Sequence, residues 1–238
     1  MELTILKIAA YLGAGLCVGI ASVTSGIGTG MIADQATIAL MRQPRANDRM
    51  FSSMLIGQAA TGTGGIFSLV VALLLLYGGF IAEGSDWTKA AALLAAGLAT
   101  GIGAIGPALG AGYTGSMACK SIGRNPKQSS ILMGNMLIGQ ALAQASSIFA
   151  LVVSLLLLFS TPRAMEGAEV ARIIVKCSAY IGAGLAIGFG TIGPGAGIGY
   201  VAGRACDMLG RFPKQRSSII RTMFLGAAVS ESTAIYSL

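Results

Sequence analysis

The same pattern of landmarks occurs three times along this sequence, with no insertion or deletion inside a copy. Landmarks of the first copy recur 82 residues later and those of the second 87 residues later: Gly19, Pro44 and Gly57 correspond to Gly101, Pro126 and Gly139, and Gly106, Pro126 and Gly139 to Gly193, Pro213 and Gly226. Constant offsets require the same local structure in each copy. The chain is therefore expected to contain three equivalent units, at residues 1–83, 84–165 and 166–238.

Each copy consists of a glycine-rich apolar segment, a short basic turn with proline, and a segment rich in Leu, Val and Ile. Of the 238 residues 54% are hydrophobic and only 11% are charged, whereas a soluble domain carries about 25% charged residues. Most of the surface must therefore face lipid or other protein. Both segments are too long for strands, and lipid tolerates no unpaired backbone group, so each segment is expected to be a helix.

The predicted fold class is an all-α membrane protein of three tandem transmembrane hairpins. Its six helices are expected near residues 4–41, 47–80, 88–122, 128–160, 168–209 and 215–238. Several exceed 30 residues, or about 45 Å at 1.5 Å per residue, and so project beyond the hydrocarbon core. The last helix ends roughly two to three turns earlier than its counterparts.

The distribution of Lys and Arg predicts the orientation of the hairpins. Eleven of the 16 lie at or beside the hairpin turns and five near the opposite ends: Arg42, Arg45, Arg49, Lys120, Arg124, Lys127, Arg204, Arg211, Lys214, Arg216 and Arg221 against Lys7, Lys89, Arg163, Arg172 and Lys176. The positive-inside rule then places the turns in the cytoplasm and both termini outside. Because these charges sit in separate short turns, we expect no nucleic-acid partner.

Glycine is concentrated in the first helix of each copy and covers more than one face. Small residues let helix backbones approach closely in lipid, so contacts on two sides predict a closed circle of glycine-rich helices inside an outer circle of aliphatic ones. A nucleotide loop is excluded because no strand precedes these glycines. The absence of His argues against a zinc site and His-based acid–base chemistry.

Glu231 is the one ionisable residue expected deep in the bilayer, well along the last helix from its basic turn. A carboxylate at that depth is costly and is normally functional. Ser232, Thr233 and Tyr236 can supply hydroxyls to it or to a bound ion. The aligned residues are Gln144 in the second copy and Gly62 in the first, so one hairpin in three can titrate. The alternative is a carboxylate near a frayed helix end, because only seven residues follow it.

This combination resembles the proteolipid of the rotor ring, the c-ring, of rotary ATP synthases and ATPases. "GPGAGIGY" at 193–200, "RFPKQ" at 211–215 and "ESTAIYSL" at 231–238 resemble bacterial F-type proteolipids, whereas fused hairpins resemble V-type proteolipids. The resemblance implies a non-catalytic subunit that forms a ring with copies of itself in a bilayer, expected to be the bacterial inner membrane. It also implies that an essential Arg of a stator a-type subunit discharges Glu231, and that central-stalk subunits dock on the turns: Arg42, Gln43, Pro44, Arg124, Asn125, Pro126, Arg211, Phe212 and Pro213.

The coupling ion is expected to be H⁺, with Na⁺ as the alternative and no other cofactor. The Glu-Ser-Thr-x-x-Tyr pattern of Glu231 to Tyr236 is typical of Na⁺-binding relatives, for which Glu231 would be a metal ligand. Those relatives also place Gln or Glu on the glycine-rich helix, where this chain has Ile198. A hard cation needs several oxygens. Gln144 could replace that oxygen only if the neighbouring hairpin presents it correctly.

Two other functions compete with this prediction. A repeat-built membrane channel or transporter would place broken helices and several polar groups at the midplane, often with inverted repeats, whereas these repeats are parallel and poor in polar groups. A purely structural proteolipid is the second alternative. For a single basic turn, positive-inside topology with proline as helix punctuation is the alternative to stalk docking.

Overall fold

The structure, a computed structural model, describes residues 2–80, 87–159 and 170–238. The expected boundaries between hairpins, at residues 83–84 and 165–166, lie outside the described residues. So does Arg163, one of the five cations expected near the ends opposite the turns.

The described residues form helices joined by short turns and contain no strand, which confirms the all-α fold class. Five helical stretches are long and apolar enough to cross a membrane, and each corresponds to an expected span. The helices are α1 (Glu2–Arg42), α2 (Asn47–Thr61), α3 (Thr63–Tyr77), α4 (Trp87–Gly103), α5 (Ile105–Arg124), α6 (Ser129–Phe159), α7 (Val170–Gly190), α8 (Ile192–Arg211) and α9 (Arg216–Ile235), with 3₁₀ turns η1 (Pro44–Ala46), η2 (Pro126–Gln128) and η3 (Pro213–Gln215).

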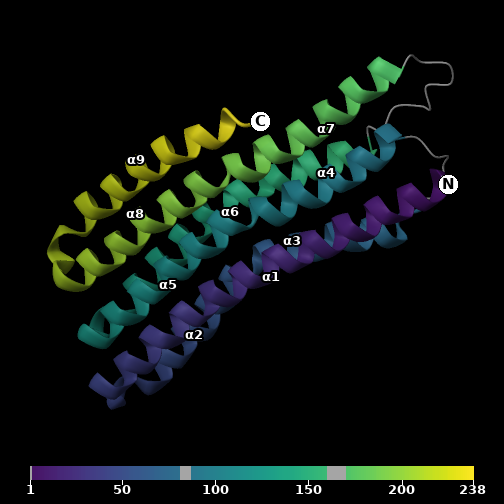
Figure 1. Ribbon diagram of the computed structural model, residues 1–238. Coiled ribbons are helices and arrows are strands. Elements are labelled where there is room, and N and C mark those ends of the chain that lie inside the picture. Colours follow the sequence, from purple (N-terminus) through teal and green to yellow (C-terminus); the bar gives the residue numbers. More distant parts are fainter. Residues whose placement is uncertain (1, 81–86, 160–169) are drawn as a thin grey trace.

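The sixth expected span, α9, is helical but is not among those five stretches. It has 20 residues, against 31 in its counterpart α6. Arg216, Arg221 and Glu231 lower its hydropathy. Figure 1 shows that α9 runs back along α8 and ends partway along the bundle.

Proline interrupts two of the three glycine-rich helices. The breaks at Ala104 and Thr191 each lie three residues before a proline, Pro107 and Pro194. A proline inside a helix donates no hydrogen bond and its ring crowds the carbonyl four residues earlier. The Gly103 carbonyl that Pro107 leaves free lies 3.4 Å from the Thr191 hydroxyl of the next hairpin. The first copy has Ser25 at the equivalent position, and α1 runs unbroken.

The hairpins lie side by side in chain order, with their turns at one end of the bundle (Figure 1). Helices α1, α4–α5 and α7–α8 pack against one another as a glycine layer. Helices α2–α3, α6 and α9 form an aliphatic layer, in which each helix packs on the glycine-rich helix of its own hairpin. Helix α6 also packs on α8, so an aliphatic helix contacts the next hairpin as well as its own.

Glycine is required where neighbouring helices of the glycine layer meet. A Cβ added to Gly112 of α5 would lie 2.5 Å from Gly28 Cα of α1, and one added to Gly101 would lie 2.9 Å from Cys17 Cα. Real Cβ atoms do not approach backbone this closely, so a side chain here would push the hairpins apart. Close approach maximises van der Waals contact, which drives helix association in lipid.

Gly112→Ala should therefore destabilise the bundle although alanine is the better helix former. We expect the thermal midpoint of the detergent-purified protein, followed by circular dichroism, to fall by several degrees, as for a loss of about 1–3 kcal/mol. Gly134→Ala in α6 is the matched control, because nothing lies within 4 Å of its added Cβ. Equal midpoints for the two variants would contradict the prediction.

Candidate functional site

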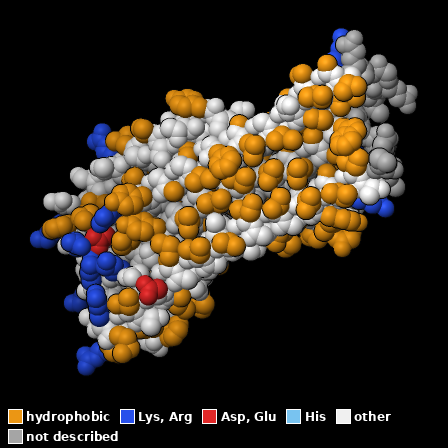
Figure 2. Space-filling model, viewed as in Figure 1, with side chains coloured by type: hydrophobic (Ala, Val, Ile, Leu, Met, Phe, Trp, Pro, Cys, Tyr) orange, Lys and Arg blue, Asp and Glu red, His pale blue; other side chains and the backbone are white. Residues whose placement is uncertain are grey.

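The three basic turns have the same geometry. Residues Gln43, Asn125 and Phe212 each precede a 3₁₀ turn that begins with proline, with φ from −138° to −125° and ψ from 63° to 78°. In each turn the backbone N–H of this residue donates to the carbonyl four residues earlier, at 2.7–3.0 Å. Figure 2 shows Lys and Arg gathered at this end of the molecule. The structure thus brings the predicted docking residues to one polar end.

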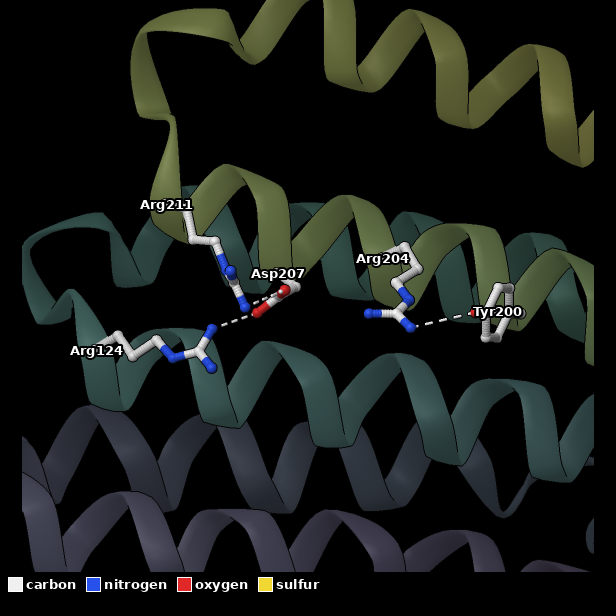
Figure 3. Close-up of polar contacts among 5 residues, drawn as sticks. All are labelled: Arg124, Tyr200, Arg204, Asp207 and Arg211. Carbon is white, nitrogen blue, oxygen red and sulfur yellow. Dashed lines mark hydrogen bonds and ion pairs between the residues drawn. The ribbon is translucent and has the colours of Figure 1, made fainter.

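A buried carboxylate joins the second and third turns. Asp207 of α8 is 2% exposed, and its carboxylate pairs with Arg124 at the end of α5 and with Arg211 of its own helix, the latter at 3.0 Å (Figure 3). Two positive groups offset the cost of burying one negative group. Sequence reasoning missed this cluster, although Asp207 stands four residues before Arg211 on the same helix.

A different contact joins the first and second turns. Arg49 of α2 donates from Nη1 to the Pro126 carbonyl at 3.0 Å. Arg42, the counterpart of Arg124 and Arg211, is exposed and has no ion-pair partner among the described residues. The three turns are therefore held together as one surface.

Two glutamines connect the layers at equivalent positions. Gln58 Nε2 donates to the Thr29 carbonyl at 3.2 Å, and Gln140 Nε2 donates to the aligned Ala111 carbonyl at 3.0 Å. Gln140 is fully buried and its Nε2 also lies 3.0 Å from the Gly57 carbonyl of hairpin 1. Hairpin 3 has Ala227 here, so its layers lack this link. The offset of 82 residues between the glutamines could have revealed them in the sequence.

Gln144, which aligns with Glu231, is held between hairpins 1 and 2. It is 7% exposed. Its Nε2 lies 3.4 Å from the Ala60 carbonyl and 3.3 Å from that of Thr61, just before the turn at Gly62, and its Oε1 accepts from Ser147 at 3.2 Å. Both ends of the amide are therefore engaged, and a carboxylate could not donate in the same way.

Glu231 is half-buried on α9 and makes no hydrogen bond within the described part of the chain. Ser232 and Thr233 donate to carbonyls of their own helix, Val229 and Ser230, each at 2.7 Å, and Tyr236 is 84% exposed. The hydrogen bonds of Gln144 lie on α2 and α6 and do not include Glu231. In a single chain the five predicted ion-binding residues are therefore not assembled into one shell.

Three tandem hairpins of apolar helices that pack through a glycine layer define a membrane proteolipid of repeated hairpins. The chain belongs to the ATP synthase C-subunit family, whose pattern matches residues 12–75, 94–157 and 181–238, one match per hairpin. The expectation of a non-catalytic membrane subunit is confirmed by this membership.

Relatives of one-hairpin and three-hairpin length both match. The K subunit of the A-type ATP synthase of Methanocaldococcus jannaschii is 32% identical over 227 residues, which cover 95% of this chain and 90% of that protein. The ATP synthase c-subunit of Dehalococcoides mccartyi is 51% identical over 67 residues, 28% of this chain and 88% of that protein. The c-subunit of Mesomycoplasma hyopneumoniae is 48% identical over 64 residues, 27% of this chain and 62% of that protein.

Asp207→Asn should loosen the joint between the second and third turns, because an amide cannot balance two guanidinium groups. We expect the free energy of unfolding in mixed micelles to fall by about 1–3 kcal/mol, since hydrogen bonds to charged groups are lost. Asp48→Asn makes the same chemical change at an exposed site and should have little effect. If both variants unfold like the wild type, the ion cluster does not stabilise the turns.

Proposed function

We propose that this chain is an ion-carrying rotor subunit of a rotary ATP synthase or ATPase. Several chains form a ring in the membrane, and Glu231 binds and releases one ion as the ring turns against a stator. Rotation couples ion flow to ATP synthesis or hydrolysis elsewhere in the complex. Membership of the C-subunit family and the names of the matched relatives support an ATP synthase assembly.

The depth of Glu231 is the observation that carries the proposal. Glu231 lies 18 residues beyond Pro213, or about 27 Å along the helix at 1.5 Å per residue. The other acidic residues of the described helices lie near a turn or a helix start: Asp34, Asp48 and Asp207 are within ten residues of a turn proline, and Glu2 begins α1. Glu231 is thus the acidic side chain at bilayer depth in the described helices, where a lone carboxylate is normally a transport group.

The contrast with Gln144 supports a single carrier in each chain. At the equivalent position Gln144 is buried, and its amide is engaged with hairpin 1 and Ser147. Glu231 is half-buried and has no competing hydrogen bond in the described residues. A carboxylate that must bind and release an ion needs to be free of competing hydrogen bonds. Gln144 therefore closes the second site, and Gly62 offers no side chain in the first.

A proton is the coupling ion in this proposal. Na⁺ needs several oxygens at once, and Ile198 provides no polar atom where Na⁺-binding relatives carry Gln or Glu. Ile198 is fully buried against Ala143 and Ala227, so the surroundings on this side are aliphatic. The Gln144 oxygen, the other candidate ligand, already accepts from Ser147. A proton requires only the carboxylate.

The common geometry of the three turns supports their role as the docking surface of the central stalk. They lie at one end of the bundle and carry the excess of Lys and Arg (Figure 2). The positive-inside rule places this end in the cytoplasm. The essential Arg of the a-type stator subunit would then meet Glu231 from the membrane side of α9. The bacterial inner membrane is the proposed location.

Replacing Glu231 by Gln should abolish ATP-driven ion transport by the assembled complex, because an amide cannot bind and release a proton. The measurement is acidification of inverted vesicles, which should fall to background. Glu231→Asp keeps an ionisable carboxyl and should retain part of the transport. A channel or a structural proteolipid would tolerate Glu231→Gln, and transport at the wild-type rate would contradict the proposal.

Dicyclohexylcarbodiimide, which reacts with protonated carboxyls in apolar surroundings, should modify one residue per chain, Glu231. Mass spectrometry of peptides would locate the adduct, with Glu231→Gln as the blank. For a proton carrier the reaction should slow as the pH rises, because the protonated form is consumed, and added Na⁺ should not change it at fixed pH. Protection by Na⁺ would assign Na⁺ as the ion.

A further inference from the structure

An open groove runs between α8 and α9 of hairpin 3. Its volume is about 470 Å³ and its walls are mostly apolar, with Val201, Ala205, Met208, Ile219 and Met223 on the two helices. Tyr200 and Arg204 line one edge. The groove carries no part of the described chain, although it lies between two packed helices.

The equivalent grooves of hairpins 1 and 2 are both filled by the glycine-rich helix of the next hairpin. In hairpin 2 the occupant is Cys206 of α8, which packs on Ala118 and Met136 and accepts from Asn135 Nδ2 at 3.2 Å. In hairpin 1 the occupant is Cys119 of α5, the residue that aligns with Cys206, in a cluster with Ile32 and Met50. The repeat therefore predicts a glycine-rich helix in the third groove.

Helix α1, in the hairpin at the other end of the row, is also glycine-rich. Its counterparts in hairpins 2 and 3 use one face to contact the preceding hairpin, and in α1 that face is uncovered. Nothing lies within 4 Å of a Cβ added to four glycines of α1: Gly15, Gly19, Gly26 and Gly30. Their counterparts in the later hairpins contact the preceding hairpin. Gly101, equivalent to Gly19, lies against Cys17, and Gly195, equivalent to Gly26, lies against Pro107. Helix α1 thus carries the contact face of this repeat without a hairpin to receive it.

Two opposite charges, Asp34 of hairpin 1 and Arg204 of hairpin 3, fit the same pairing, although Asp34 also lines a pocket with Lys120 of hairpin 2. Gly203 and Ser116 align with Asp34, and a Cβ on Gly203 would lie 2.6 Å from the ring of Tyr113 in the preceding hairpin. By the same register, Asp34 of a second chain lies beside Tyr200.

Arg204 lies beside Tyr200, where the register places Asp34 of the second chain. Its guanidinium lies 5.4 Å from the centroid of the Tyr200 ring and donates to the Tyr200 hydroxyl at 3.3 Å (Figure 3). Both Arg204 and Asp34 are exposed, and neither has an ion-pair partner among the described residues. The Asp34 carboxylate accepts only from Gln35, at 2.9 Å, within this part of the chain.

We propose that the chains join head to tail, with α1 of one chain in the α8–α9 groove of the preceding chain and an ion pair from Arg204 to Asp34 across the joint. This inference rests on the proposed ring and identifies the faces that close it. Such a contact uses two different surfaces and repeats by rotation, as a closed ring requires. The occupant of the groove is therefore a second copy of this chain.

Charge exchange tests the ion pair. Asp34→Arg and Arg204→Asp should each place like charges across the joint and lower the temperature at which half of the detergent-purified oligomer dissociates. The double variant should restore that temperature. Asp48→Arg, an exposed charge reversal away from the joint, is the control and should leave it unchanged. Single variants with wild-type midpoints, or a double variant that adds the two losses, would overturn the pairing.

Disulfide formation tests the joint independently of its charges. Chains with Asp34→Cys and chains with Arg204→Cys, tagged differently and with Cys177 replaced by Ala, are co-expressed in the assembled complex and oxidised. The other three native cysteines are buried. Cross-linked pairs should contain one chain of each kind, and neither variant alone should cross-link.

The outcomes separate the joint from the proposed function. A closed oligomer without the cross-link, with lipid or a one-hairpin proteolipid in the groove by native mass spectrometry, overturns the joint and leaves the rotor proposal standing. Chains that form no oligomer at all contradict the rotor proposal and the joint together. A cross-link within a closed oligomer of this chain alone supports both.

Discussion

The close approach of helix backbones in the glycine layer is the contact on which the rest of the structure depends. Lipid chains are as apolar as the helices, so burial of apolar surface does not hold the hairpins together as it would in water. Contact must come from atoms that touch. There is no room for a methyl group at Gly112, between hairpins 1 and 2, or at Gly199, between hairpins 2 and 3. This fixes the spacing of the three hairpins and makes their backbones nearly interchangeable.

Because the three hairpins share one plan, single side chains at equivalent positions distinguish them. The position that carries Glu231 in hairpin 3 carries an engaged amide in hairpin 2 and no side chain in hairpin 1. The position of Gln140 shows the reverse, with an interlayer hydrogen bond in the first two hairpins and Ala227 in the third. The first two hairpins are thus tied more firmly across the layers, while the third keeps its carboxylate unengaged within the described chain.

The constant offsets of the repeat were enough to predict the helices and turns, because the same apolar segments and proline turns recur at the same spacing in each copy. The interruptions at Ala104 and Thr191 were not predicted, although Pro107 and Pro194 were visible, since the extent of a proline break depends on the neighbours that satisfy the freed carbonyl. The Asp207 cluster escaped sequence reasoning for a related reason. Asp207 and Arg124 are 83 residues apart and meet only because two hairpins pack side by side.

The site residues also divide into features that the sequence predicts and features that depend on packing. The proposed depth of Glu231 follows from its distance along the helix from the turn, which the sequence contains. The hydrogen bonds of Gln144 to Ala60 and Thr61 depend on the rotation of α6 against hairpin 1, and the sequence does not specify that rotation. In the proposed ring a neighbouring chain would complete the surroundings of Glu231, which neither the sequence nor a single chain supplies.

The engagement of Gln144 has a mechanical consequence for a rotor built from this chain. In the proposed rotor two hairpins without a carboxylate separate one Glu231 from the next, so each ion exchanged at the stator advances the ring by the width of three hairpins. The energy of a single ion is then delivered over a long stroke, and the ring advances in few large steps. At a fixed energy per ion, a larger rotation angle for each ion means a smaller torque.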